Sequence, residues 1–397
     1  MYKLNINIPS GMRDMLYDEA ILEAEVLARL ESVYKKEGFS KVITPTLEYY
    51  DAFNFAGQPL PQENMYKLTD NAGRLLVLRP DCTTPIARVA ATKLKDMQRP
   101  LKLSYSQNVY RVNHGYSGKR NEIMQSGVEL IGLDGIKSDI MCITTAVKAL
   151  DALGADFKIE IGHVEFYNAL ISELDMSDEQ KEIVRDYVDS KNAVSLGFIE
   201  DTAGIEKIMQ IPLLFGGKEV FDRARKIAGD NTRALGALEI VKKTYTLLEE
   251  AGYGDRILID LGLVHKLDYY TGIVFRGFID GAGEPVLHGG RYNNLISNFG
   301  CDVPSIGFAI SVGAVTDTLY KSEKNRLDPE VADSVIFFDS ESFPVADKVR
   351  REKEAAGETV EMSCFESEAT TREYAIAKGI KKLITVLDGE IKSEEQI

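Results

Sequence analysis

The chain has 397 residues, of which 44% are hydrophobic and 27% charged, so it is long enough for two or three globular domains. Its formal charge of −15 at pH 7 opposes broad nucleic-acid binding, because such binding depends on Lys and Arg neutralising phosphates. The four cysteines form no CxxC pair, and no apolar stretch has the length of a membrane span. These features argue against a zinc ribbon, a disulfide scaffold and a membrane protein. We therefore expect a cytoplasmic protein without a metal site or cofactor.

The first half of the chain is predicted to form one helix followed by several strands. Residues 17–37 place apolar side chains at steps of three and four, which is the spacing of an amphipathic helix. Residues 39–51 are β-branched and aromatic but contain Pro45, which predicts a strand that bends or lies at a sheet edge. Because the strand candidates follow one another with few helices between them, we expect a largely antiparallel sheet. The other candidates are residues 75–81, 101–112, 122–132, 157–162 and 272–280.

The rest of the chain predicts a helical insertion and a separate C-terminal unit. The segment from about 168 to 252 is charged and helical in pattern, with glycines between its helices. Residues 321–333 are polar and contain Pro329, which is typical of a linker. We therefore place one large domain at residues 1–325 and a small α/β domain at residues 330–397.

Several motifs resemble those of histidyl-tRNA synthetases, in the same order along the chain. They are IPSGMRD (8–14), ITPTLEYYD (43–51), LRPDCTTPIAR (78–88), YRVNHGYSGKRNEIMQSGVELIG (110–132), HKLDYYTGIVF (265–275) and HGGRYNNL (288–295). This resemblance implies the α+β fold of class II aminoacyl-tRNA synthetases, an antiparallel sheet of six or seven strands flanked by helices. It also implies dimerisation through the helix and strand of the first motif. The C-terminal unit resembles a truncated anticodon-binding domain.

The resemblance implies a pocket for free histidine as well. The family holds the amino group of histidine with a glutamate, a threonine and a glutamine, which match Asp81, Thr83 and Gln125. Asp81 is one methylene shorter than the glutamate of the family. The imidazole ring is read by a glutamate and a tyrosine, which match Glu129 and Tyr270, and a carboxylate with a hydroxyl can satisfy both ring nitrogens. The candidate histidine-binding residues are therefore Asp81, Thr83, Arg111, Gln125, Glu129, Tyr269 and Tyr270.

The positions that true synthetases use for adenylation are different here. Adenylation needs cations around the triphosphate, and the resemblance assigns this task to arginines that the chain mostly lacks. The motif 3 pattern GFAxGxER reads GFAISVGA, without its acid and arginine. We therefore expect no aminoacylation and assign no catalytic residue. The altered positions are Asn113, Lys119, His265, Lys266, Gly313 and Ala314.

For several of these residues a purely structural role stays open. Gln125 and Glu129 lie four apart, so both face the same side of a strand. The adjacent tyrosines at 269–270 face opposite sides, so one of them can be a core residue. Residues 289–291 can form a turn with a surface arginine. Arg111 can be the partner of a structural ion pair.

Paralogues of this family that keep histidine binding and lose adenylation are regulatory subunits of ATP phosphoribosyltransferase. The resemblance implies the same non-catalytic role here, required by the short-form catalytic subunit and for inhibition by L-histidine at the first step of histidine biosynthesis. The expected partners are that catalytic subunit, L-histidine and a second copy of the chain, with no nucleic acid and no membrane. Two alternatives stay open, a divergent histidyl-tRNA synthetase and a sensor of uncharged tRNA. The sensor needs a basic RNA-binding face, which the acidic composition opposes.

Overall fold

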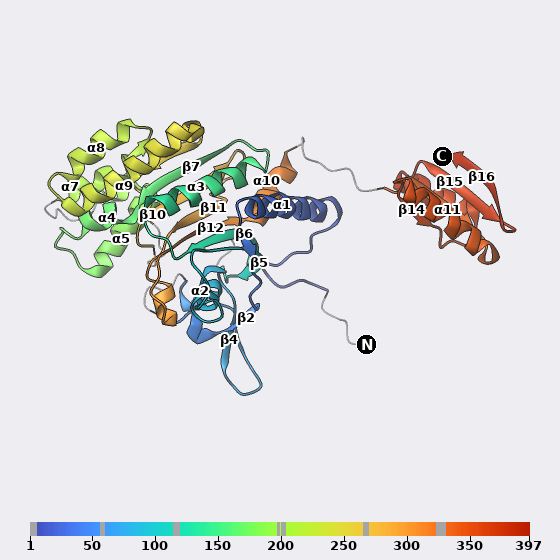
Figure 1. The fold of residues 1–397 in the computed structure, drawn as a ribbon, viewed down its shortest axis with the longest axis horizontal. Helices are drawn as coiled ribbons and strands as arrows, with labels where there is room; N and C mark the ends of the chain where they lie inside the picture. Colours follow the sequence, from blue (N-terminus) through green and yellow to red (C-terminus); the bar gives the residue numbers. More distant parts are fainter. Residues whose placement is uncertain are drawn as a thin grey trace. The chain divides into compact units, whose positions relative to one another are not determined.

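The computed structural model describes residues 6–55, 60–113, 120–196, 199, 204–264, 270–322 and 331–397. The chain divides into two compact units, Met1–Asn325 and Arg326–Ile397, each with its own sheet and helices (Figure 1). Among the described residues, no helix combines the length and the apolar composition needed to cross a bilayer.

The larger unit is built on a nine-stranded sheet. Its neighbouring strands are antiparallel except for two pairs, β1 with β5 at one end and β7 with β9 next to the other end, which are parallel. The predicted fold class is confirmed, but the sheet is larger than expected and mixed, because the insertion between β7 and β9 provides the crossover that a parallel pair needs. In spatial order the strands are β1 (Ser40–Lys41), β5 (Leu101–Tyr110), β6 (Glu122–Ile131), β12 (Ser305–Ser311), β11 (Leu287–Arg291), β10 (Ile273–Ile279), β7 (Phe157–His163), β9 (Ile257–Asp260) and β8 (Phe215–Gly216).

Helices cover the two faces of this sheet unequally. The predicted first helix is α1 (Tyr17–Lys36), which buries Leu22, Val26, Leu30 and Tyr34 at steps of four. The Tyr34 ring meets Phe308 of β12 edge-on at a centroid distance of 6.1 Å, so α1 packs on the face to which Phe308 points. On the opposite face lies α2 (Thr83–Ala91), which packs on β5. The other long helices of this core are α3 (Ile136–Asp151) and α10 (Val312–Lys321).

Most of the segment between β7 and β9 is helical, as the sequence pattern predicts. Three of its helices start at side-chain caps: His163 accepts from the Glu165 N–H, Ser177 forms a capping box with Gln180, and Asn231 accepts from the Ala234 N–H. The short strand β8 leaves the helical layer and pairs with β9 at the sheet edge. The helices are α4 (Val164–Ile171), α5 (Asp178–Asp189), α6 (Ala193–Leu196), α7 (Ile205–Gln210), α8 (Glu219–Ala228) and α9 (Thr232–Leu248).

A small second sheet of the larger unit consists of β2 (Leu47–Tyr49), β4 (Leu75–Leu78) and β3 (Lys67–Thr69). The single bent strand predicted for residues 39–51 is in fact two strands, β1 and β2, in different sheets. Pro45 lies between them, where it interrupts the ladder because proline has no N–H to donate. The guanidinium of Arg79 binds the carbonyl oxygens of Thr44 at 2.8 Å and of Pro45 at 3.1 Å, which fixes this break.

The C-terminal unit is a small α/β layer structure. Its central strand β13 (Ser334–Phe338) is parallel to β14 (Val360–Met362) and to β15 (Lys382–Leu387), and β16 (Glu390–Gln396) is antiparallel to β15. The connecting helices are α11 (Phe343–Ala355) and α12 (Glu368–Lys378). The fully buried side chains of Val335, Ile336, Leu383 and Ile384 lie between these helices and form two small clusters, one on each side of the sheet.

Candidate functional site

The candidate site lies on the face of the large sheet that α2 partly covers. Glu129 of β6, Gly307 of β12 and Gly290 of β11 stand next to one another in the strand register. A side chain at Gly307 would collide with the Glu129 carboxylate, and one at Gly290 would lie 2.7 Å from the Tyr270 ring. Because neither glycine has a side chain, the side chains of Glu129 and Tyr270 can lie directly over the sheet at these two positions.

Glu129 is a buried carboxylate with a hydroxyl donor on each oxygen. Its side chain is 1% exposed; the Thr83 hydroxyl donates to Oε1 at 2.8 Å, and the Tyr292 hydroxyl donates to Oε2. Burial raises the pKa of Glu129 to about 8, although the two hydroxyl bonds lower it. Such a carboxylate suits a ligand that brings an N–H donor or a positive charge.

The walls around Glu129 are largely apolar. Ile86 of α2, Tyr105 of β5 and Tyr292 belong to one buried cluster, and Tyr270 packs against it. Burial raises the pKa of Tyr105 well above its ordinary value. In such surroundings an unpaired polar group is costly, so the few polar groups present decide which ligand fits.

Asp81 lies beside this pocket but is bound to the start of α2. Its Oδ1 accepts a hydrogen bond from the Thr84 N–H at 2.7 Å, and its Oδ2 accepts one from the Thr84 hydroxyl at 3.1 Å. Burial raises the pKa of Asp81, and the charge of Arg111 opposes this rise. The carboxylate thus satisfies a helix N–H that would otherwise lack a partner.

Arg111 is held by backbone groups. Its Nε donates to the Pro80 carbonyl at 2.8 Å, and its own N–H donates to the Asn121 carbonyl at 2.8 Å. Its charge also acts on the nearby Asp81 carboxylate, whose pKa it lowers against the larger effect of burial. The guanidinium orders the turn that precedes Asp81.

Of the other residues expected to bind histidine, the structure describes Gln125 and Tyr270 but not Tyr269. Gln125 is half-buried and points to the same face as Glu129, opposite Gln107 of β5 and Ser311 of β12. Tyr270 lies over Gly290, on the site face. Tyr269 lies outside the described residues, as do Lys119, His265 and Lys266.

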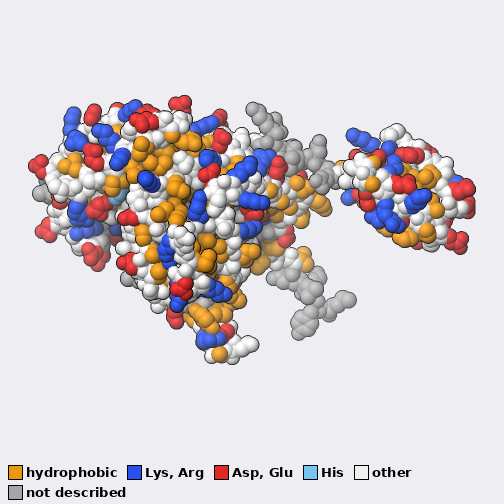
Figure 2. All heavy atoms as spheres, viewed as in Figure 1, with side chains coloured by type: hydrophobic (Ala, Val, Ile, Leu, Met, Phe, Trp, Pro, Cys, Tyr) orange, Lys and Arg blue, Asp and Glu red, His pale blue; other side chains and the backbone are white. Residues whose placement is uncertain are grey.

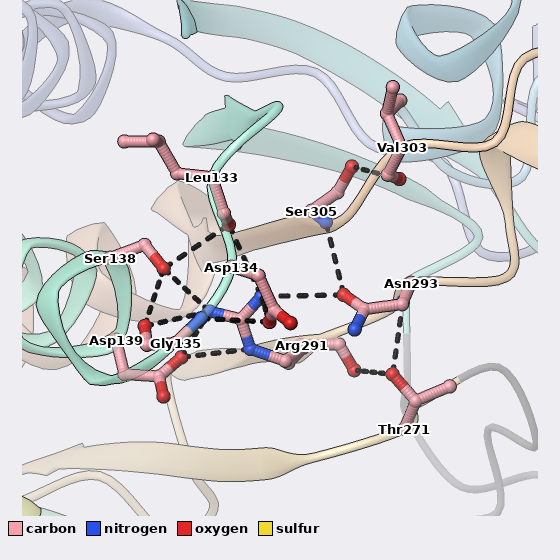
Figure 3. Close-up of polar contacts among 10 residues, drawn as sticks. All are labelled: Leu133, Asp134, Gly135, Ser138, Asp139, Thr271, Arg291, Asn293, Val303 and Ser305. Carbon is pink, nitrogen blue, oxygen red and sulfur yellow. Dashed lines mark hydrogen bonds and ion pairs between the residues drawn. The ribbon is translucent and has the colours of Figure 1, made fainter.

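The side chain of Arg291 lies on the opposite face of the sheet, where it binds Ser138 and Asp139 (Figure 3). It is 5% exposed, and its Nη2 contacts the Asp139 carboxylate at 2.6 Å and the Ser138 hydroxyl at 2.7 Å. The interpretation of residues 289–291 as a turn with a surface arginine is therefore wrong, because these residues form the buried strand β11. Arg291 attaches this strand to the first turn of α3.

Comparison with known proteins places the chain in a family. The histidyl-tRNA synthetase family model matches residues 11–315. The ATP phosphoribosyltransferase regulatory subunit of Clostridium acetobutylicum is 39% identical, over 100% of this chain and 98% of that protein. The protein of the same name from Clostridium kluyveri is 41% identical, over 95% of this chain and 98% of its own length. The chain belongs to the ATP phosphoribosyltransferase regulatory subunit branch of the histidyl-tRNA synthetase family. The predicted family is thus confirmed.

A solved structure agrees with this membership. The crystal structure described as an ATP phosphoribosyltransferase regulatory subunit/histidyl-tRNA synthetase from Bacillus halodurans has a TM-score of 0.84 to this chain at 29% identity. The match covers 97% of this chain and 99% of that one. The sheet and helices of both units therefore follow the fold of the regulatory subunit branch.

In this member of the regulatory subunit branch, the motif 3 region forms the end of β12 and the start of α10. A side chain at Gly313 would lie 2.8 Å from Nη1 of Arg120, whose Nη2 contacts Oδ2 of Asp317 at 2.5 Å. An arginine just before β6 thus packs against α10 at this point. Among the residues that the structure describes, no group of three or more His, Cys, Asp or Glu is placed to hold a metal ion.

Sequence reasoning missed two residues of the site, Tyr292 and Gly307. Tyr292 is 2% exposed and donates to Glu129, and Gly307 lies beside Glu129 in the next strand. Strand alternation offered a signal for Tyr292, because a residue two positions after Gly290 points to the same face. Nothing local identifies Gly307, since its role depends on the pairing of β12 with β6.

Proposed function

We propose that this chain is a regulatory subunit of ATP phosphoribosyltransferase. It is required for the activity of the short-form catalytic subunit and conveys inhibition by L-histidine at the first step of histidine biosynthesis. The observation that carries this proposal is the 39–41% identity, over nearly the whole length, to proteins of that name. Histidine need only bind the inhibited assembly better than the active one, by about 1–3 kcal/mol.

L-histidine is the ligand that we propose for the pocket around Glu129. The Glu129 carboxylate lies in an apolar pocket beside the Tyr270 and Tyr292 rings, which suits a planar ring that carries N–H donors. A buried carboxylate that keeps its proton at neutral pH can release it to pair with an imidazolium. Asp81, Thr83, Arg111, Gln125 and the undescribed Tyr269 are the other proposed contributors.

The proposed subunit does not activate amino acids. Adenylation needs arginines that bind the triphosphate, and Gly313 and Ala314 occupy the motif 3 positions where a synthetase has an acid and an arginine. Asn113 supports the same view, because its side chain binds the Arg120 carbonyl at 2.7 Å and Asn121 Oδ1 at 3.1 Å. These local bonds leave this side chain few groups for a nucleotide.

Self-association is a further part of the proposal. One face of the small second sheet carries exposed Leu47 and Tyr49 of β2 and Leu68 of β3, and the register puts them on the same side. Exposed apolar faces of this kind are typical of protein contacts. A second copy of the chain is the partner that we propose for this face.

The cytoplasm is the compartment that we propose for this protein. Its four free cysteines are consistent with a reducing environment.

A divergent histidyl-tRNA synthetase is the alternative function. Residues 331–397 contain nine basic and fifteen acidic side chains, and the two signs are interspersed on the face seen in Figure 2. A domain that binds an anticodon needs a basic surface, because phosphate contacts supply most of the affinity for RNA. Histidine-dependent ATP–pyrophosphate exchange by the chain would establish this alternative.

Phosphoribosyl-ATP formation by a short-form catalytic subunit from the same organism tests the proposal. The reaction is measured with and without this chain, across a titration of L-histidine. We expect the chain to activate the reaction and histidine to inhibit only the activated enzyme. Glu129→Gln is expected to weaken inhibition while activation persists. Absence of any effect of the chain on the transferase would refute the regulatory role, and pyrophosphate exchange then decides between the alternatives.

A further inference from the structure

The side chain of Tyr105 lies on the sheet beside Glu129. Tyr105 of β5 stands opposite Gly127 of β6 in the strand register, and a side chain at Gly127 would lie 2.7 Å from the Tyr105 hydroxyl. The hydroxyl is therefore directly above β6 at Gly127. Because Gly127 and Glu129 are two positions apart on one strand, they face the same side of the sheet. The Tyr105 hydroxyl and the Glu129 carboxylate are thus neighbours on the face that forms the candidate site.

The Tyr105 hydroxyl is buried and has no hydrogen-bond partner among the residues that the structure describes. Two other hydroxyls at this place, those of Thr83 and Tyr292, both donate to Glu129. A buried hydroxyl that pairs with neither the protein nor a ligand is unfavourable, because it has lost its hydrogen bonds to water. Tyr105 therefore carries a hydrogen-bonding group that is available to a ligand.

The position of its hydroxyl distinguishes Tyr105 from an ordinary buried tyrosine. The hydroxyl of Tyr167 in α4 also lacks a partner among the described residues, but it is fully enclosed by the protein. The Tyr105 side chain is 1% exposed, and its hydroxyl is not one of the fully enclosed polar atoms. Burial raises the pKa of Tyr105, and the charge of Glu129 is the strongest charge that adds to this rise. The hydroxyl therefore faces the space next to Glu129, where a ligand of the pocket would lie.

We infer that Tyr105 is a further ligand-binding residue of the pocket, and that its hydroxyl binds one nitrogen of the ligand ring while Glu129 binds the other. A hydroxyl can donate or accept, so it suits an imidazole nitrogen with or without a proton. The ligand class is a planar ring with two hydrogen-bonding atoms. This inference rests on the proposed binding of L-histidine at Glu129, and it adds a residue outside the motifs that resemble the family.

Tyr105→Phe is the informative variant, because it removes the hydroxyl and leaves the ring. Calorimetric titration of the full chain with L-histidine measures the dissociation constant, which we expect to rise about tenfold through the loss of one hydrogen bond. The midpoint of thermal unfolding without ligand is expected to stay equal or to rise, because an unpaired buried hydroxyl is removed. A hydroxyl that only supported the fold would give the opposite result, a lower midpoint with an unchanged dissociation constant.

Tyr167→Phe is the matched control. It removes a buried hydroxyl that also has no partner among the described residues, but it does so in the helical insertion. We expect the control to have the same effect on thermal unfolding as Tyr105→Phe. The dissociation constant of L-histidine is expected to stay unchanged in the control.

Each contrary outcome has a distinct meaning. If Tyr105→Phe is folded and binds L-histidine as tightly as the unmodified chain, the inference is wrong and the proposed function stands. A loss of affinity in Tyr270→Phe alone would then assign the second ring nitrogen to Tyr270. The inference is also wrong if the affinity of Tyr105→Phe falls only together with its unfolding midpoint. If L-histidine neither binds the unmodified chain nor inhibits the activated transferase, histidine sensing by this pocket fails together with the inference.

Discussion

Glu129 combines full burial with two hydroxyl donors, so its protonation state depends on what enters the pocket. Burial raises its pKa to about 8, from an ordinary value of 4.5. A cationic ring beside the carboxylate favours the charged form and releases the proton. At the residue scale, ligand binding and proton release are therefore expected to be linked.

Glu129→Gln is expected to flatten the pH dependence of stability. Between pH 4.5 and 8 the folded chain keeps a proton on Glu129 that the unfolded chain has lost, so this residue lowers the free energy of unfolding as pH rises. The slope it contributes is at most about 1.4 kcal/mol per pH unit. Urea unfolding of the variant at pH 5, 6.5 and 8 checks this. Glu182→Gln, on the exposed side of α5, is the control. Equal slopes for the unmodified chain and Glu129→Gln would contradict a raised pKa.

Gly307→Ala is expected to weaken ligand binding, because the added methyl group meets both the Glu129 carboxylate and the backbone of β6. A Cβ atom at this position would collide with the Glu129 carboxylate and would lie 2.5 Å from the Val128 carbonyl oxygen, so both that side chain and the pairing of β12 with β6 must shift. Thermal unfolding verifies that the variant is folded. Calorimetry with L-histidine measures the loss, which we expect to exceed about tenfold. Gly236→Ala in α9 is the matched control, because a methyl group there meets nothing within 4 Å. Normal affinity in Gly307→Ala would show that Glu129 is not the group that binds the ligand.

At the scale of elements, one strand serves both faces of the sheet. Successive residues of a strand point to opposite sides, so Gly290 opens the pocket while Arg291 binds α3 on the other face. The guanidinium also reaches the carbonyl oxygens of Leu133 and Gly135 at 3.3 Å, in the turn before α3 (Figure 3). The packing of α3 and the shape of the pocket therefore depend on the same short segment.

Arg291→Met is expected to destabilise the large unit by about 3–5 kcal/mol, the usual cost of leaving a buried carboxylate without its partner. Burial already raises the pKa of Asp139, and Arg291 is the group that opposes this rise. Chemical denaturation measures the loss. The double variant Arg291→Met with Asp139→Leu is expected to recover a large part of it, because no buried charge then remains. Additive losses in the double variant would refute the pairing.

On the scale of the whole molecule, the chain joins an acidic C-terminal unit to a large unit with an exposed apolar sheet face. Leu47 and Leu68 are exposed on one side of the small second sheet, and Tyr49 lies beside them with the Arg74 guanidinium over its ring. Burial of such a face yields about 25 cal/mol for each square ångström of apolar area removed from water. An oligomer that covers this face is therefore expected in solution.

Leu68→Asp is expected to convert a dimer of the chain into a monomer, because a charge at the centre of an apolar contact must lose its hydration. Sedimentation velocity across a range of concentrations measures the change. Thr69→Asp is the matched control, since the neighbouring residue of β3 points to the other side of the sheet. The assignment of this face fails if the variant keeps the mass of the unmodified chain, or if the control also dissociates.

The sequence by itself determined the type of most elements, the family, and the common orientation of Gln125 and Glu129. These features follow from local periodicity and from motif residues in a fixed order, both of which are properties of the chain alone. It also located the break at Pro45, although not that β1 and β2 join different sheets. The missing N–H of Pro45 can be known from the sequence, because it is a property of that residue. The strand with which β1 or β2 pairs depends on the rest of the fold.

Only the tertiary structure decided how the site residues are used. Asp81 binds the start of α2, Thr83 orients Glu129 across 46 positions of the chain, and Arg291 lies buried against Asp139. These contacts depend on which strands and helices become neighbours, and spacing within a motif carries no information on that. The two parallel pairs of the sheet have the same origin, because they require long crossovers whose path is set by packing and not by local pattern.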